Sequence, residues 1–376
     1  MVGFSGYGSF YADFLLGNPY DMRYAFKAVV DTFLSPDSKA LLDEKGIPYF
    51  ENLTDFYRDN TCDLVIISSP MQFHKNQCEI AVKNGSVVLC EKPTTARLSD
   101  LYEMHEYEKE YDKDIFIGFQ WSFARPILAL KNDIIAGKFG KVLSAKALVL
   151  WPRNLDYYSR STGWAGKVKT ADGLYVYDSV ASNATAHYLN NMLFLFGERM
   201  DKSVGIEKID AECFKANDIE SFDTCIIRAK TVGGQKVLFI ASHATDKSRE
   251  PILEIKCEKA VISCDFSKDS GRLTAEFENG DVKDYGQVST MREQHEKIVS
   301  VINWLSDSEK NQKPVSTVMT TEAFTKIIDY VFENTEFAKF DDVKLDSEKN
   351  CLHVDGLFEK LCTVYDNEAK NNPRQN

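Results

Sequence analysis

The sequence predicts an α/β domain with a parallel sheet, followed by an α+β domain with a large, mostly antiparallel sheet. In the first third, short apolar segments alternate with helix-like segments, as in parallel sheets that are covered on both faces. Further on, long apolar segments flank Gly233-Gly234 and Asn279-Gly280, which favour hairpin turns. The chain has 376 residues, too many for one typical core.

The elements of the first domain are predicted from these apolar segments and from the residues that start or end helices. Ser35-Pro36 and Gly46 are typical start and stop signals of a helix. Strands are expected at 2–5, 24–31, 62–70, 86–93 and 115–121, and helices at 11–18, 35–46, 71–85 and 98–112. The expected domain boundary lies near residue 121, which gives domains 1–121 and 122–376.

In the second domain the expected elements are longer. A long strand is expected at 141–151, and hairpins within 221–245 and 272–286. Helices are expected at 290–306 and 317–335.

Composition excludes several classes of protein. The net charge of −12 argues against a basic nucleic-acid-binding surface. The nine cysteines form no C-x-x-C pair and no close group with His or Asp, so neither a disulfide framework nor a metal site is expected. We expect no signal peptide and no membrane-spanning segment, and a reducing cytoplasm fits the cysteines best.

A glycine-rich turn lies at the start of the chain. Residues 6–11 read G-Y-G-S-F-Y, which is a G-x-G-x-x-G turn with Tyr11 in place of the third glycine. Gly6 and Gly8 keep the two positions that form the turn and let the backbone approach a pyrophosphate, whereas Tyr11 changes only helix–strand packing. We expect the backbone at Tyr7, Ser9 and Phe10 to help bind phosphate at the helix N-terminus. The alternative is a plain strand–turn–helix.

Asp31 ends the second expected strand, about 20 residues after the turn, where a ribose-binding acid belongs. A carboxylate there accepts hydrogen bonds from both ribose hydroxyls and repels a 2′-phosphate. It therefore favours NAD over NADP.

The segment 68–95 resembles the Gfo/Idh/MocA family of glucose–fructose oxidoreductase and inositol dehydrogenase. Ser69-Pro70 and His74 match the family's T-P-x-x-x-H stretch, and Glu91-Lys92-Pro93 matches its E-K-P turn. Gly85, Gly137 and Gly140 also fit, while Ser122 stands where many members have arginine.

This resemblance implies a Rossmann domain, a second domain with a large antiparallel sheet, and a nicotinamide cofactor. It also implies dimers or tetramers built through that sheet. The cofactor-binding residues that we expect beyond the glycine turn and Asp31 are Ser69, Pro70, His74, Glu91, Lys92 and Gln120.

Lys92 follows a buried strand, at the edge of the sheet where ligands bind in such folds. Near a nicotinamide it can donate a hydrogen bond to the substrate oxygen, and burial would lower its pKa toward a useful range. The alternative is a solvated lysine in a loop.

The segment 172–197 holds the other catalytic candidates. Asn183 and His187 are four residues apart, which predicts one helix face, with Ser182 or Asn183 as the N-cap. In the family the pattern is D-x-G-x-H, with the histidine about three turns before a glycine. His187 and Gly197 match that spacing, while Asn183 stands in place of the usual acid. His187 would accept the substrate proton and Asn183 would position the substrate, since an amide is no base. His187 as a satisfied core residue is the alternative.

Asp178 and the loop 151–169 complete the expected site. Asp178 would hold substrate hydroxyls or tune His187; it would otherwise be a turn acid. Tyr157, Tyr158, Arg160, Trp164 and Lys167 would form a wall that binds the substrate, since aromatic faces suit sugars. An arginine or lysine of this set would bind a carboxylate or phosphate on the substrate. The alternative is a structural Ω-loop.

We therefore expect an NAD-dependent oxidoreductase that acts on a sugar, a cyclic polyol or a sugar derivative. Two alternatives remain open. One is an NAD-dependent glycosidase of the same family, in which the bound cofactor is reduced and re-oxidised within one cycle. The other is a non-catalytic sensor that keeps the cofactor fold and binds a partner.

Overall fold

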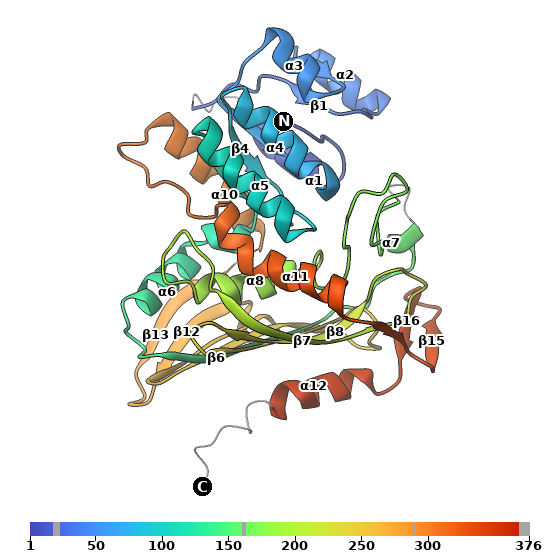
Figure 1. Ribbon diagram of the computed structural model, residues 1–376, viewed down its shortest axis with the longest axis vertical. Coiled ribbons are helices and arrows are strands. Elements are labelled where there is room, and N and C mark those ends of the chain that lie inside the picture. The colour runs from blue at the N-terminus through green and yellow to red at the C-terminus, as the bar shows by residue number, and fades with distance from the viewer. Residues whose placement is uncertain (18–22, 160–162, 289, 368–376) are drawn as a thin grey trace. The chain divides into compact units, whose positions relative to one another are not determined.

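The computed structural model describes residues 1–17, 23–159, 163–288 and 290–367, and the chain divides into two compact units (Figure 1). The first unit comprises Met1–Phe123 and Thr290–Glu322, and the second comprises Ala124–Ser289 and Ala323–Asn376. The first division follows Phe123, close to the expected boundary at 121, whereas 290–322, which was expected in the second domain, belongs to the first unit.

The first unit contains a parallel sheet, as predicted. Its strands are β1 (Val29–Val30), β2 (Tyr49–Phe50), β3 (Leu64–Ile67), β4 (Val87–Cys90) and β5 (Ile115–Ile117). The strand expected at 2–5 is reduced to Val2, which bridges Val30 on one side and Ile67 on the other. The pairings among β1–β5 and the two bridges of Val2 are parallel.

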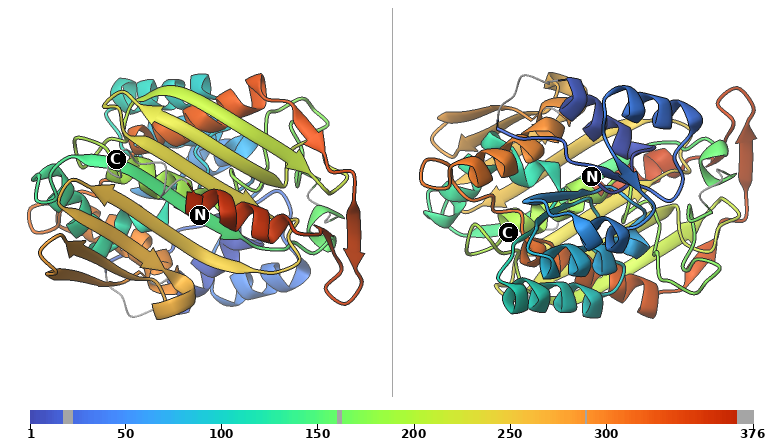
Figure 2. Two further views of the ribbon diagram at one scale, coloured as in Figure 1. Left: turned by 90° about the horizontal axis from the view of Figure 1, so that it is seen from below. Right: turned by 90° about the horizontal axis from the view of Figure 1, so that it is seen from above.

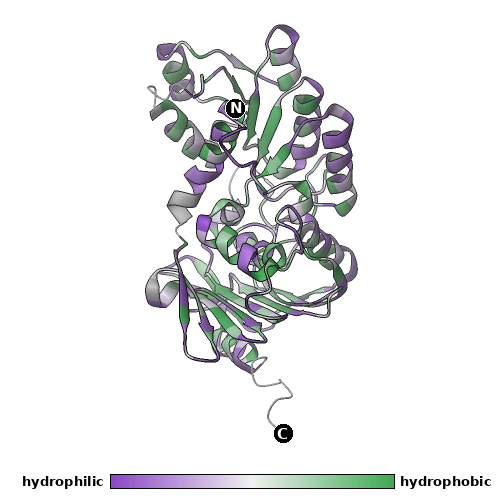
Figure 3. Ribbon diagram, turned by 90° about the vertical axis from the view of Figure 1, so that its left-hand side faces the viewer, coloured by the Kyte–Doolittle hydropathy of each residue, from purple (hydrophilic) through white to green (hydrophobic). Residues whose placement is uncertain are grey.

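Helices cover both faces of this sheet. They are α1 (Tyr7–Gly17), α2 (Pro36–Glu44), α3 (Leu53–Asp59), α4 (His74–Lys83), α5 (Leu98–Tyr111) and α10 (Thr290–Ser306), with short 3₁₀ turns at Met71–Phe73 and Gln120–Phe123. Ser35 and Asn52 cap α2 and α3 with their side chains. Figure 3 shows the apolar strands inside this unit and polar residues on the outer surfaces of its helices.

Apolar packing explains why 290–322 joins the first unit. Ile298, Val301 and Ile302 of α10 lie in one buried cluster with Tyr11 and Phe116. Burial of such side chains contributes about 1.5–3 kcal/mol each. An amphipathic helix has the same sequence pattern whichever sheet it covers, so the pattern alone did not reveal the partner.

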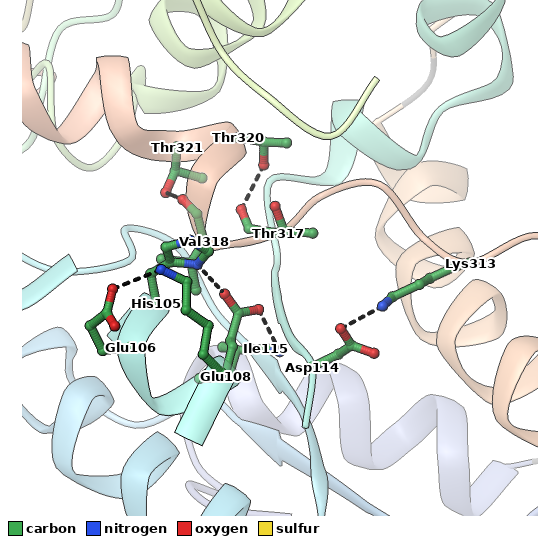
Figure 4. Close-up of polar contacts among 11 residues, drawn as sticks. His105, Glu106, Glu108, Asp114, Ile115, Lys313, Thr317, Val318, Thr320 and Thr321 are labelled. Carbon is green, nitrogen blue, oxygen red and sulfur yellow. Dashed lines mark hydrogen bonds and ion pairs between the residues drawn. The ribbon is translucent and has the colours of Figure 1, made fainter. Parts of the chain in front are cut away.

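The segment that follows α10 then runs along the edge of the sheet. The Ile117 amide donates to the Ser316 carbonyl at 2.7 Å, and Thr317 forms an antiparallel bridge with Phe116. Lys313 pairs with Asp114 at 2.6 Å (Figure 4). The short turn Val318–Thr321 ends this segment.

The second unit is built on a nine-stranded sheet, in the order β13-β12-β11-β10-β6-β9-β8-β7-β14. Its pairings are antiparallel except for β6 with β9 and β14 with β7, so the expected mostly antiparallel sheet is confirmed. Both predicted hairpins are present, as β8–β9 and β12–β13. The strands are β6 (Val142–Leu150), β7 (Ile206–Lys215), β8 (Thr224–Thr231), β9 (Lys236–Ser242), β10 (Arg249–Cys257), β11 (Ala260–Asp265), β12 (Arg272–Phe277), β13 (Val282–Gln287) and β14 (Phe337–Lys339).

Helix α12 lies across one face of this sheet, which sequence patterns did not predict (Figure 2). Leu357, Leu361 and Tyr365, spaced by four residues, pack on Leu148 of β6 and Ile240 of β9. One face of the sheet through which the resemblance implied subunit contacts is thus partly covered by α12 of the same chain. The remaining elements are α6 (Arg125–Ile135), α7 (Asp156–Ser159), α8 (Ala186–Leu195), α9 (Phe266–Asp269), α11 (Glu322–Asn334), α12 (Leu357–Asn367) and the hairpin β15 (Val343–Asp346) with β16 (Cys351–Val354).

Candidate functional site

The carboxyl edge of the parallel sheet gathers the residues that were expected to bind cofactor. Parallel strands end at one edge, and each of these residues follows a strand. The glycine turn follows Val2, Asp31 follows β1, Ser69 and Pro70 follow β3, Glu91 and Lys92 follow β4, and Gln120 follows β5.

The glycine turn is shaped for an approaching ligand. Gly6 has a φ of +59°, and a Cβ added there would meet nothing within 4 Å. Gly8 differs, because an added Cβ would lie 2.2 Å from the Gly3 carbonyl oxygen. The turn thus leaves open space over Gly6 at the N-terminus of α1, where backbone N–H groups suit a phosphate. These residues fit a dinucleotide.

Tyr11 does more than replace the third glycine. Its ring is fully buried in the apolar cluster beneath α1, and its hydroxyl donates a hydrogen bond to the Glu91 carboxylate. The close helix–strand approach that a third glycine usually permits is made at Gly8 instead. The packing adjustment expected at Tyr11 is therefore a specific contact with the turn that carries Lys92.

Lys297 of α10 completes this buried network. Its side chain is fully buried and forms an ion pair with Glu91. The ammonium also lies over the rings of Tyr7 and Tyr11, at 5.1 and 4.9 Å from their centroids. Burial lowers the pKa of Lys297, while the Glu91 charge opposes that shift.

Glu91 also holds the backbone of Lys92 in place. Its Oε2 accepts the Lys92 backbone N–H at 3.1 Å, while Oε1 faces Tyr11 and Lys297. Gly118 leaves the space for this carboxylate, because a Cβ there would lie 2.9 Å from Oε1. Sequence analysis missed Lys297, although its spacing from Val301 places it on the apolar face of α10.

Asp31 is oriented by the backbone around it. Its Oδ2 accepts the Phe4 N–H at 2.8 Å and its Oδ1 accepts the Phe33 N–H at 2.9 Å. The carboxylate is thereby held at the end of β1.

The Phe10 side chain stacks on His295 of α10, with ring centroids 4.7 Å apart. Only the backbone of Phe10 is therefore left to contribute to a phosphate site.

His74 braces two of the expected cofactor loops. It is buried, with Nδ1 3.0 Å from the Pro93 carbonyl oxygen and Nε2 3.0 Å from that of Ser69. Burial lowers its pKa. Its side chain therefore joins the Ser69 loop to the turn after Lys92.

In the second unit, three predicted substrate residues meet. The Asn183 amide nitrogen lies 2.7 Å from the Tyr157 hydroxyl and 3.0 Å from Asp178 Oδ1. The other Asp178 oxygen accepts the Gly166 N–H at 2.6 Å. The Asp178 carboxylate therefore lies beside the Asn183 amide.

The predicted helix face of Asn183 and His187 is wrong. Helix α8 begins at Ala186, and Asn183 lies in the turns before it. Ser182 Oγ donates to the Tyr177 carbonyl and Thr185 Oγ1 to that of Val180. Such side-chain bonds compete with helix formation, and neither Ser182 nor Asn183 caps α8, whose N-cap is Thr185.

His187 lies in the first turn of α8 and is partly buried. The other end of α8 is fixed by Lys131, which is buried and donates to the carbonyls of Phe194 at 2.7 Å and Lys202 at 2.8 Å. Gly197 is required there, because a Cβ would lie 1.9 Å from the Lys202 oxygen.

The loop 151–169 is partly structural. Lys167 pairs with Glu220 at 2.8 Å, and burial raises the pKa of Tyr158. Trp164 is partly buried. Arg160 lies outside the described residues.

The described ranges contain neither a candidate metal site nor a candidate membrane-spanning helix. No group of three or more His, Cys, Asp or Glu side chains is placed to hold a metal ion. None of the helices described is long and apolar enough to cross a bilayer.

Replacing Gly8 tests the close approach of α1 to the first strand. Gly8→Ala should lower the free energy of unfolding by about 1–3 kcal/mol, because the added Cβ meets backbone that cannot give way. Gly17→Ala on the same helix is the control, since its Cβ would meet nothing within 4 Å. Urea denaturation measures both, and equal stability of the two variants would contradict the contact.

Removing the Lys297 charge tests the buried pair. Lys297→Met should cost about 3–5 kcal/mol of unfolding free energy, because Glu91 is left buried without its partner. The double variant Glu91→Gln, Lys297→Met should recover most of that loss. Lys313→Met, which breaks a partly exposed pair, should cost no more than about 1 kcal/mol. A Lys297→Met protein as stable as the wild type would rule out this role.

Comparison with known proteins agrees with this geometry. Residues 1–119 match the Gfo/Idh/MocA model, described as an oxidoreductase family with an NAD-binding Rossmann fold. Myo-inositol 2-dehydrogenase of Thermotoga maritima is 24% identical over 225 residues, which are 59% of this chain and 62% of that protein. Inositol 2-dehydrogenase of Leifsonia xyli is 28% identical over 164 residues, 43% of this chain and 48% of that protein. The match thus spans less than two thirds of each relative.

A solved structure extends the likeness of fold to both units. The WlbA dehydrogenase of Bordetella pertussis, in complex with NADH and UDP-GlcNAcA, superposes with a TM-score of 0.68 at 19% identity. The superposition covers 88% of this chain and 94% of that one. Residues 1–119 therefore match the NAD-binding Rossmann domain of the Gfo/Idh/MocA oxidoreductase family, and the rest of the chain shares the fold of the solved structure.

Proposed function

We propose that this protein is an NAD-dependent oxidoreductase that transfers a hydride between nicotinamide and a carbinol carbon of a sugar, cyclic polyol or sugar derivative. One observation carries the proposal. Lys92 follows β4 at the edge of the sheet that also holds the glycine turn, and Glu91 fixes its backbone through contacts with Tyr11 and Lys297.

The first unit supplies the residues that would hold the cofactor. The N–H groups around Gly6 and Gly8 would bind the pyrophosphate and Asp31 the adenine-side ribose, which favours NAD over NADP. The loops braced by His74 would line the site with Ser69, Pro70, Glu91 and Gln120. When bound, NAD supplies a nicotinamide that accepts a hydride from the substrate carbon.

Residues of the chain would bind the substrate oxygen and accept the substrate proton. Lys92 would donate a hydrogen bond to that oxygen, and His187 would accept its proton. Asn183 would orient a neighbouring hydroxyl, and the contact of its amide with Asp178 keeps a carboxylate beside it. This contact supports a substrate role for the group despite the missing acid at position 183.

The relatives support a polyol or sugar as the substrate. Both curated relatives compared above are inositol 2-dehydrogenases, which act on a cyclic polyol by name. We place the activity in the cytoplasm, where the nine free cysteines would stay reduced. We also propose a homo-dimer or homo-tetramer, in which any contact through the face that carries α12 would include that helix.

Replacing Lys92 tests the function. Lys92→Met should lower kcat by about 10²–10⁴-fold on any sugar or polyol that the wild type oxidises, because the substrate oxygen loses its donor. NADH formation followed at 340 nm measures the rate. Lys83→Met, at the end of α4, is the control and should keep the wild-type rate.

The same assay separates the rival functions. A Lys92→Met enzyme with wild-type turnover would contradict the proposed role. A glycosidase would release sugar with no net NADH, and a sensor would bind NAD without turnover of any compound in the screen.

A further inference from the structure

Arg153, which sequence analysis did not single out, is a partly buried cation in the expected substrate loop. Its guanidinium carbon lies 4.5 Å from the centre of the Tyr157 ring. Its Nε is buried and has no hydrogen-bond partner. Within the described part of the chain, no carboxylate lies at ion-pair distance from it.

The other two described cations of this loop are either paired with a carboxylate or exposed to solvent. Lys167 is paired with Glu220 at 2.8 Å. Lys169 is exposed and lies 4.2 Å from the centre of the Tyr175 ring. Of the loop cations that the structure describes, Arg153 combines burial of a donor atom with the absence of an acceptor.

This arrangement calls for an anionic ligand. A buried donor that lacks an acceptor is costly, and buried charges in proteins are generally paired. The planar guanidinium matches the two oxygens of a carboxylate or phosphate. The Tyr157 ring lies against one side of the guanidinium, and the backbone N–H of Arg153 donates to the His243 carbonyl at 3.1 Å, which holds the main chain at this position.

Tyr157 links Arg153 to the residues that were expected to hold substrate hydroxyls. Arg153 lies on the face of its ring, while the Asn183 amide contacts its hydroxyl at 2.7 Å and continues to Asp178. One tyrosine therefore joins an anion-binding group to a hydroxyl-binding group.

We propose that Arg153 binds an oxyanion carried by the substrate, so that the substrate is an acidic sugar or polyol with a carboxylate or a phosphate. This inference rests on the proposed function for the meaning of the ligand as a substrate. Arg153 acts in it as a specificity-determining residue.

Calorimetric titration with three matched ligands tests the proposal without turnover. D-glucuronate carries a carboxylate, D-glucose 6-phosphate carries a phosphate, and D-glucose carries neither. The wild type should bind at least one of the two anions ten or more times as tightly as glucose, and the stronger anion identifies the source of the charge. Equal binding of all three, or binding of none, would overturn the proposal.

Variants locate the effect. Arg153→Met should abolish the preference for the anion, while Arg153→Lys should keep part of it, because the charge remains without the planar fork. Lys169→Met removes an exposed cation that also lies over a tyrosine ring, so it is the matched control and should leave the preference unchanged. An anion preference that survives in Arg153→Met would overturn the assignment, as would one lost only in Lys169→Met.

The test is separable from the proposed function. If the wild type prefers the anion but forms no NADH with any substrate, the oxidoreductase proposal fails and the Arg153 site stands. If NADH forms from neutral polyols with no anion preference, the Arg153 proposal fails and the oxidoreductase stands.

Discussion

The buried pair of Glu91 and Lys297 is the interaction on which the first unit depends. It joins the turn after β4 to α10, and Tyr11 adds α1 to the same carboxylate. Gly118, after β5, leaves room for it. A buried ion pair is not in itself strongly stabilising relative to an apolar core. Its consequence here is positional, because a single carboxylate fixes the backbone of Lys92 and requires α10 to lie against the parallel sheet.

This network also explains how the glycine turn tolerates Tyr11. In the usual pattern the third glycine permits close packing of helix on strand. Here Gly8 makes the close approach, with its Cα facing the Gly3 carbonyl, and the space beneath α1 is filled by the tyrosine ring. Gly6, over which the turn leaves open space, is kept. Gly8 therefore makes the close contact that the third glycine usually permits, and Tyr11 adds a hydrogen bond to the turn that carries Lys92.

Local chemistry made much of the fold predictable. Short apolar strands between helices gave the parallel sheet, and Gly233-Gly234 and Asn279-Gly280 gave the hairpins. Contacts between distant segments were not predictable in this way. The α10 pattern specifies an apolar face but not the sheet that it packs against. Lys297 pairs with Glu91, which lies 206 residues earlier in the chain. Asn183 was misplaced because the spacing of four suits a helix, whereas Ser182 and Thr185 bond back to the chain and keep it in turns.

If the turn with Tyr11 forms an NAD site, the wild-type protein should bind NAD directly. A pair of calorimetric titrations, one with NAD and one with NADP, measures this. We expect saturable binding of one NAD per chain and at least tenfold weaker binding of NADP, since Asp31 disfavours a 2′-phosphate. Binding of neither dinucleotide would contradict the assignment of an NAD site, because it would mean that Tyr11 closes the site.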